Sequence, residues 1–153
     1  MATPHLIIDP DSLIVALESH EAETEWALNL RTGEVIPVIN PAITGDRTAQ
    51  DEIAREPNSY VYIAPIPSTQ SFRIMESFVA GLPPGPARNR LLAALDRRHP
   101  FREFKSALLA FPALRTQWFR HHEQCMRPIA ADWLAGNNVN GVLGAAPTGE
   151  RGV

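Results

Sequence analysis

Residues 25–39, with the sequence EWALNLRTGEVIPVI, decide the fold class of this chain. In the first six of these residues, Trp26, Leu28 and Leu30 alternate with other residues, and a period of two predicts a β-strand. The next four residues, RTGE, include Gly33, and glycine readily supplies the positive φ that a short hairpin turn needs. We therefore expect an antiparallel hairpin.

The following segments extend the hairpin into a small sheet. Residues 34–39 form the returning strand, and Pro37 places it at a sheet edge or near its own end, because proline cannot donate to a strand ladder. The YVYI run of residues 60–63 predicts a third strand, which the prolines of the following APIP run at residues 64–67 end. A short helix is expected between these strands, over residues 46–55.

The chain before the hairpin predicts a helix. The sequence DPDS at residues 9–12 is typical of a helix start, and Asp11 is a candidate N-cap. Leu13, Ile14 and Leu17 then share one face of the expected helix. An early helix therefore precedes the sheet strands.

From Ser68 onward the hydrophobic period becomes helical. Ile74, Phe78 and Leu82 recur every four residues, which predicts a helix that the PPG of residues 83–85 ends. Further helices are expected to begin at Pro86, Pro100 and Pro112, the last running to about Ala135. The fold class is therefore α+β, with a small antiparallel sheet of about three strands in the N-terminal half packed with a helical C-terminal half.

The chain length predicts one domain. A chain of 153 residues has the size of a typical domain and buries a core without needing disulfides or metals. We expect residues 1–136 to form a single α+β domain. Residues 137–153 are rich in Gly, Asn, Thr and Ala, and we expect them to form a flexible C-terminal tail.

Composition excludes several classes of protein. Hydrophobic residues make up 44% of the chain and charged residues 20%, which is typical of globular rather than disordered proteins. The single cysteine excludes an intrachain disulfide framework and a multi-cysteine zinc site. The first residues show neither the basic region of a secretion signal nor the apolar run of a membrane span, so we expect a cytoplasmic protein without membrane contact.

Charge is distributed unevenly along the chain. Residues 1–72 hold 11 acidic residues against three arginines, a net charge of −8. Residues 73–127 hold ten basic residues against four acidic ones, a net charge of +6. The basic half is either a surface for nucleic acid or another acidic partner, or it pairs with the acidic half of the same fold.

Six polar residues of the helical half are candidate binding residues. Arg73 and Glu76, three positions apart on a helix, are expected to form a weak surface pair. The sequence places Arg102 and Lys105 on the side of their helix that faces away from two phenylalanines expected in the core, Phe101 and Phe104. The full candidate set, which either contacts a partner or forms a solvated, salt-bridging surface, is Arg73, Glu76, Arg98, Arg102, Lys105 and Arg120.

The HHEQC run at residues 121–125 has the spacing of metal ligands. His121 and Cys125 are four residues apart and could reach one ion. A helical wheel, however, places Cys125 and His122 inside an apolar stripe and His121 at its edge. A buried cysteine usually acts as a small hydrophobic side chain. We therefore interpret the cluster as structural and expect neither a metal site nor a cofactor. A kink is expected at Pro128, which cannot donate to the carbonyl of Gln124.

The order of several motifs resembles the bacterial uncharacterised protein family 0158. The segments that carry the resemblance are WALNLRTGEVI at residues 26–36, FRIMESF at 72–78, PFREFKSAL at 100–108, PALRTQWF at 112–119 and ADWL at 131–134. The resemblance covers about residues 10–135. It implies a cytoplasmic, single-domain, mixed α/β protein and carries over no activity. The chain departs from the family's pattern at His121, His122 and Pro128, where the family tends to have charged helix formers.

Three functional hypotheses follow. The sequence contains no phosphate-binding glycine loop, nucleophile elbow or paired-carboxylate motif, which favours a non-enzymatic interaction or regulatory module of the bacterial cytoplasm. It would bind a protein partner or self-associate through its acidic and basic halves. The first alternative is a nucleic-acid-associated protein that uses the arginines between Arg88 and Arg127. The second is an enzyme with a site around Arg73, Glu76 and the tyrosine strand, Tyr60 or Tyr62.

Overall fold

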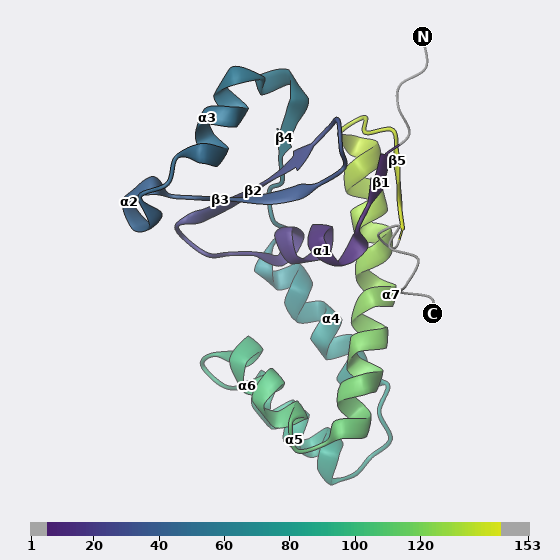
Figure 1. The fold of residues 1–153 in the computed structure, drawn as a ribbon. Helices are drawn as coiled ribbons and strands as arrows, with labels where there is room; N and C mark the ends of the chain where they lie inside the picture. Colours follow the sequence, from purple (N-terminus) through teal and green to yellow (C-terminus); the bar gives the residue numbers. More distant parts are fainter. Residues whose placement is uncertain (1–5, 145–153) are drawn as a thin grey trace. The chain divides into compact units, whose positions relative to one another are not determined.

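The computed structural model describes residues 6–144 and has the expected α+β class (Figure 1). The described residues divide into two compact units: unit 1 comprises residues 6–66 and 127–144, and unit 2 comprises residues 67–126. The long helix α7 (Pro112–Gly136) contributes its first part to unit 2 and its last part to unit 1. The expected single domain over residues 1–136 stays a prediction.

Unit 1 contains all the strands of the described residues. Its three-stranded sheet has the order β3-β2-β4, and both pairings are antiparallel. A second, two-stranded sheet joins β1 to β5 in parallel. In chain order the elements are β1 (Leu6–Ile8), α1 (Pro10–Glu18), β2 (Thr24–Asn29), β3 (Val35–Ile39), α2 (Pro41–Thr44), α3 (Thr48–Arg55), a 3-10 turn (Pro57–Ser59), β4 (Tyr60–Tyr62) and β5 (Gly141–Leu143).

The predicted hairpin is confirmed. In the β2–β3 pair Leu28 lies opposite Val35, and Pro37 lies opposite Trp26 on an edge strand, where a missing N–H is tolerated. Gly33 has a φ of 81°, and its N–H donates to the carbonyl of Asn29 to close the turn. A Cβ at Gly33 would lie 2.7 Å from the carbonyl oxygen of Ile7, so the turn also requires glycine for its close approach to β1.

The central strand is buried on both faces, which the sequence pattern did not predict. Ala27 packs with Val38, Tyr60 and Ile53 of α3, while Leu28 is fully buried on the opposite face. Burial is therefore continuous from Ala27 to Asn29 instead of alternating. A two-sided environment removes the solvent-facing side that alternation requires, so the prediction of one buried side is corrected.

Helix α1 has its N-cap two residues earlier than predicted. Asp9, not Asp11, is the N-cap: its carboxylate accepts from the backbone N–H of Ser12 at 3.1 Å and from the Ser12 hydroxyl at 2.8 Å. Pro10 occupies the first helical position, where its fixed φ and missing N–H are tolerated. Asp11 lies in the first turn, where a negative charge interacts favourably with the helix dipole.

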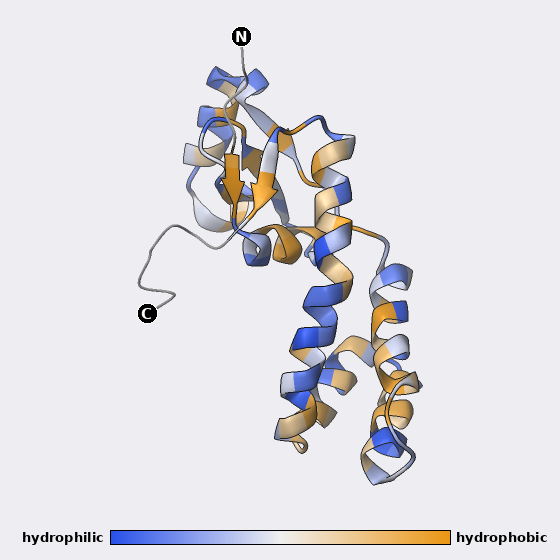
Figure 2. Cartoon of the chain, turned by 90° about the vertical axis from the view of Figure 1, so that its right-hand side faces the viewer, coloured by the Kyte–Doolittle hydropathy of each residue, from blue (hydrophilic) through white to orange (hydrophobic). Residues whose placement is uncertain are grey.

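The parallel sheet of β1 and β5 corrects part of the predicted tail. Leu6, Ile7 and Ile8 pair with Gly141, Val142 and Leu143, and Figure 2 shows two neighbouring, largely orange arrows that point the same way. A Cβ at Gly141 would lie 3.1 Å from the carbonyl oxygen of Leu6, so glycine suits this close pairing. Residues 141–143 are thus paired strand. Residues 145–153 of the expected tail lie outside the described residues.

Unit 2 is helical, as predicted. Its helices α4 (Ser68–Ala80), α5 (Pro86–Leu95) and α6 (Pro100–Leu108) are followed by the first part of α7. Pro86, Pro100 and Pro112 each occupy the first position of a helix. The core holds Phe104, whose ring lies 6.4 Å from that of Phe78 and 4.9 Å from that of Trp118. Phe101, expected in the core, is 37% exposed, which corrects that prediction.

Helix α7 is the longest helix of the described residues. It runs through Pro128 and ends at Gly136, close to the predicted end at Ala135. Hydrophilic and hydrophobic residues occur together along it (Figure 2). Within residues 6–144, neither α7 nor any other helix combines the length and the apolar character needed to cross a membrane.

Candidate functional site

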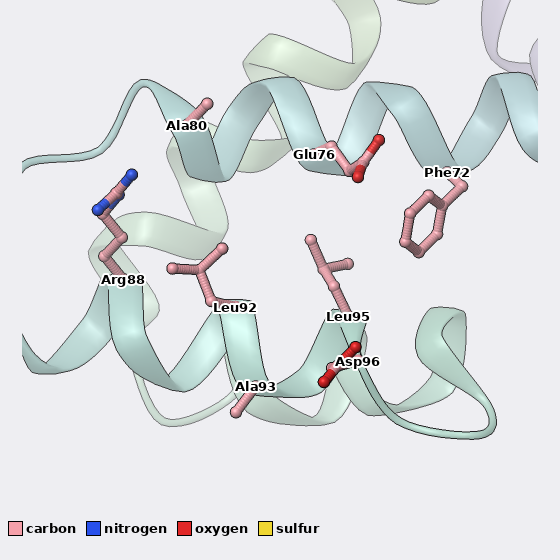
Figure 3. Close-up of a pocket in the computed structure, with 8 residues that line it drawn as sticks. All are labelled: Phe72, Glu76, Ala80, Arg88, Leu92, Ala93, Leu95 and Asp96. Carbon is pink, nitrogen blue, oxygen red and sulfur yellow. The ribbon is translucent and has the colours of Figure 1, made fainter.

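An open groove between α4 and α5 is the candidate functional site of unit 2. It has a volume of about 610 Å³. Figure 3 shows Phe72 projecting from α4 toward α5, and Leu92 and Leu95 projecting from α5 toward α4. The groove is lined by Phe72, Glu76, Ala80, Arg88, Leu92, Ala93, Leu95 and Asp96.

Helical spacing brings these side chains to the groove. Phe72, Glu76 and Ala80 are four residues apart along α4, and therefore lie on one face, one turn above the other. This face is separate from the buried face of α4, which carries Ile74, Met75, Phe78 and Val79. On α5 the groove residues Arg88, Leu92 and Leu95 follow a spacing of four and three, while Leu91 and Ala94 turn into the core.

The groove combines apolar side chains with three charged residues, Glu76, Arg88 and Asp96. Leu92 is 44% exposed, and the ring of Phe72 contacts that of Phe101 edge to face at 6.4 Å. Glu76 on α4 and Asp96 on α5 lie in the half of the groove toward Phe72, with Leu95 between them, and Arg88 lies at the other end (Figure 3). The Arg88 Nε–H donates to the carbonyl of Val79 at 3.3 Å, which fixes this guanidinium close to α4.

All six predicted binding residues lie in unit 2 and are exposed. Of these, only Glu76 lines the groove. The prediction that they bind a partner stays a prediction. Their positions are α4 for Arg73 and Glu76, the loop before α6 for Arg98, α6 for Arg102 and Lys105, and α7 for Arg120.

The expected pair of Arg73 with Glu76 is not formed, and Arg102 of this set instead pairs with a residue that the sequence did not indicate. Arg102 lies 3.7 Å from the Glu103 carboxylate, its neighbour on α6. Among residues 6–144 the ion pairs do not include one between Arg73 and Glu76. The Glu76 side chain instead lines the groove (Figure 3).

The histidine and cysteine of the HHEQC run meet a serine of α4. His121 Nε2 lies 2.9 Å from the Ser77 hydroxyl and 3.6 Å from the Cys125 thiol. The His121 ring also lies 5.4 Å from that of Phe78 and 6.1 Å from that of Trp118. The imidazole is thus part of the aromatic packing of unit 2.

The hydrogen bonds of Ser77 argue against nucleophilic catalysis by this cluster. The Ser77 hydroxyl donates its only proton to the carbonyl of Ile74 at 2.8 Å, so toward His121 it acts as acceptor. His121 Nε2 then carries a proton and cannot remove one from Ser77. Burial raises the pKa of the Cys125 thiol, which lowers its thiolate fraction at neutral pH.

The tyrosine strand belongs to unit 1 and has a structural network. The Tyr60 hydroxyl donates to the Glu52 carboxylate, and Asn29 Nδ2 approaches that hydroxyl at 3.4 Å. The hydrogen bond to Glu52 raises the pKa of Tyr60. Tyr60 is buried in the core of this unit, whereas Tyr62 is half exposed. Arg73 and Glu76, which the enzyme hypothesis groups with these tyrosines, belong to unit 2.

The part of the chain that the structure describes has few clustered metal-ligating side chains. In residues 6–144 no group of three or more His, Cys, Asp or Glu side chains is arranged to hold a metal ion. His121 and Cys125 supply two such side chains, and a structural zinc site needs four.

Most of the groove residues are not among the predicted binding residues. Leu92 and Leu95 are absent from that set, and Phe72 occurs only in the family-like segment FRIMESF at residues 72–78. The available signal was spacing: Phe72, Glu76 and Ala80 form a second stripe beside the core stripe of their helix. The stripe faces Leu92 and Leu95 because of the way α4 packs against α5. Residue spacing alone does not predict that packing.

Comparisons with known proteins identify relatives without a described activity. A family model described as "Uncharacterised protein family (UPF0158)" matches residues 3–146. A UPF0158 protein of Pseudomonas aeruginosa is 30% identical over 143 residues, which cover 94% of this chain and 91% of that protein. No solved structure matches the chain.

Proposed function

The chain belongs to the uncharacterised protein family UPF0158, and we propose that it is a non-enzymatic interaction or regulatory module of the bacterial cytoplasm. The observation that carries the proposal is the open groove between α4 and α5. Single exposed apolar residues are ordinary on protein surfaces, whereas apolar side chains gathered in a groove with a few polar groups are the usual makeup of a binding site. Phe72, Leu92 and Leu95 supply that apolar surface, with Phe101 beside it.

The geometry of the groove favours a protein segment over a reacting substrate. Its charged groups are separated, with Glu76 and Asp96 in the half near Phe72, Arg88 at the other end, and Leu92 between them (Figure 3). General acid–base chemistry needs polar groups that converge on one reacting atom. Separated end charges instead suit a partner that lies along the groove.

Site-specific photo-crosslinking in native cells tests the proposal. A photoreactive phenylalanine derivative replaces Leu92 in the full chain, and the crosslinked partner peptide is mapped by mass spectrometry. The matched control carries the same residue at Val15, which is 54% exposed on α1 of unit 1. We expect one discrete protein adduct from position 92, lost when Leu95→Glu is added. Equal or diffuse adducts from both positions would contradict the proposal.

The charge of unit 2 favours nucleic-acid association as a second candidate function. Residues 67–126 hold nine Lys or Arg against four Asp or Glu, and Arg98, Arg102, Lys105 and Arg120 are all exposed. Such a surface predicts binding to duplex DNA or RNA that weakens steeply with salt. Fluorescence anisotropy with labelled duplexes at low salt measures it. Absence of binding there, or binding that survives Arg98→Ala with Arg102→Ala at full strength, would end this candidate.

A further inference from the structure

We propose that the partner in the α4–α5 groove is a short amphipathic helix, oriented with its N-terminal end beside Glu76 and Asp96 and its C-terminal end beside Arg88. The inference rests on the proposed function, because it names the partner of the same groove. The partner is a helix of another protein, with apolar residues on one face and basic residues in its first turn.

The shape of the groove selects a helix. The stripe from Phe72 to Ala80 covers nine residues of α4, whose eight steps correspond to about 12 Å or roughly two helical turns. A helix with apolar residues at i, i+4 and i+7 presents side chains at matching intervals to Phe72, Leu92 and Leu95. An extended segment binds best where a sheet edge offers free backbone groups, whereas the backbone groups within α4 and α5 are already paired.

The end charges select the direction of that helix. The N-terminus of a helix carries a partial positive charge and its C-terminus a partial negative charge. Within residues 6–144, neither Glu76 nor Asp96 forms a salt bridge, so both carboxylates are available at their end of the groove. Arg88, held by the Val79 carbonyl, supplies the opposite charge at the other end. The partner therefore runs in the same direction as α4, from Phe72 toward Ala80.

Two synthetic peptides of identical composition test both the helix and its direction. Each has about 15 residues with leucines at positions 4, 8 and 11. One carries two lysines in its first turn and two glutamates in its last, and the other carries them in reverse order. The reversed peptide is the better helix former in isolation, since its charges suit its own dipole. A preference for the lysine-first peptide therefore cannot come from helicity.

Fluorescence anisotropy with the full-length protein measures the affinities. Exposed ion pairs and helix-end charges each contribute modestly, so we expect the lysine-first peptide to bind roughly fivefold to tenfold more tightly. Glu76→Gln with Asp96→Asn removes this preference, and Leu92→Asp weakens both peptides at least about tenfold. Asp11→Asn, an exposed carboxylate of unit 1, is the matched control and changes neither affinity.

The outcomes separate this inference from the proposed function. Equal affinities, or a preference that survives Glu76→Gln with Asp96→Asn, overturn the inferred direction. If neither peptide binds at millimolar concentration while position 92 crosslinks to a partner, the helix inference fails and the interaction function stands. A dimer-sized adduct assigns the groove to a second copy of the chain and also overturns the inference. Absence of both crosslinking and peptide binding removes both proposals.

Discussion

Substitution of Gly33 by alanine tests how the hairpin is anchored in unit 1. Gly33 has a φ of 81° in the β2–β3 turn, and an added Cβ would meet the Ile7 carbonyl oxygen at 2.7 Å. That oxygen belongs to the backbone of β1, which pairs with β5 and cannot move away as a flexible side chain would. The substitution therefore strains the turn and pushes β1 from its place.

The magnitude has two parts. Holding a non-glycine residue in the left-handed region costs about 1–2 kcal/mol. Forcing an extra methyl group against fixed atoms adds about 1–3 kcal/mol. We therefore expect Gly33→Ala to lower the free energy of unfolding by roughly 2–5 kcal/mol.

Gly45→Ala is the matched control for this prediction. Gly45 also has a positive φ, 72°, but an added Cβ there has no atom within 4 Å. It should therefore show only the backbone cost, about 1–2 kcal/mol. Urea denaturation followed by circular dichroism gives both free energies. If Gly33→Ala costs no more than Gly45→Ala, the close contact between the turn and β1 is refuted.

Three further predictions concern the core and the titrating groups. Phe104→Ala should lower the free energy of unfolding by about 3–5 kcal/mol in urea denaturation, and a loss below 1 kcal/mol would contradict its place in the unit 2 core. Because the pKa of Tyr60 is raised by Glu52, its stabilisation is complete below pH ~10 and is lost as the pH rises through the folded-state pKa. Tyr60→Phe should therefore flatten the alkaline loss of stability, and a profile parallel to that of the parent protein would argue against the Tyr60–Glu52 hydrogen bond. Cys125 should react with iodoacetamide at pH 7 more slowly than cysteine in an unfolded peptide, because burial raises the thiol pKa; equal rates in mass spectrometry would show that the thiol is not shielded.

Local signals predicted the elements of the fold well. The Gly33 turn and the edge position of Pro37 follow from the φ preference of glycine and the missing N–H of proline, which act within a few residues. The proline-initiated helices follow for the same reason. The N-cap at Asp9 was missed, although a proline at the first helical position points to the preceding residue as the cap.

The candidate site was predicted much less well than the fold. Glu76 was selected as a binding residue and does line the groove, but Arg73 beside it does not. The predicted binding residues are all charged, because charged residues on a helical face can be recognised in the sequence. The groove instead depends on apolar residues such as Leu92, whose exposure is set by the neighbouring helix and not by its own hydrophobicity.

The sequence by itself determined the α+β class, the hairpin and the proline starts of the helices, since each depends on interactions between residues close together in the chain. Tertiary structure alone decided three features: the parallel pairing of β1 with β5, the two-sided burial of Ala27 and Leu28, and the stripe of α4 that faces α5. Each of these brings together segments that are distant in sequence or covers a face with another element. The periodicity of a sequence predicts which residues share a face of a helix or strand. Only the packing of the elements determines which other residues that face contacts.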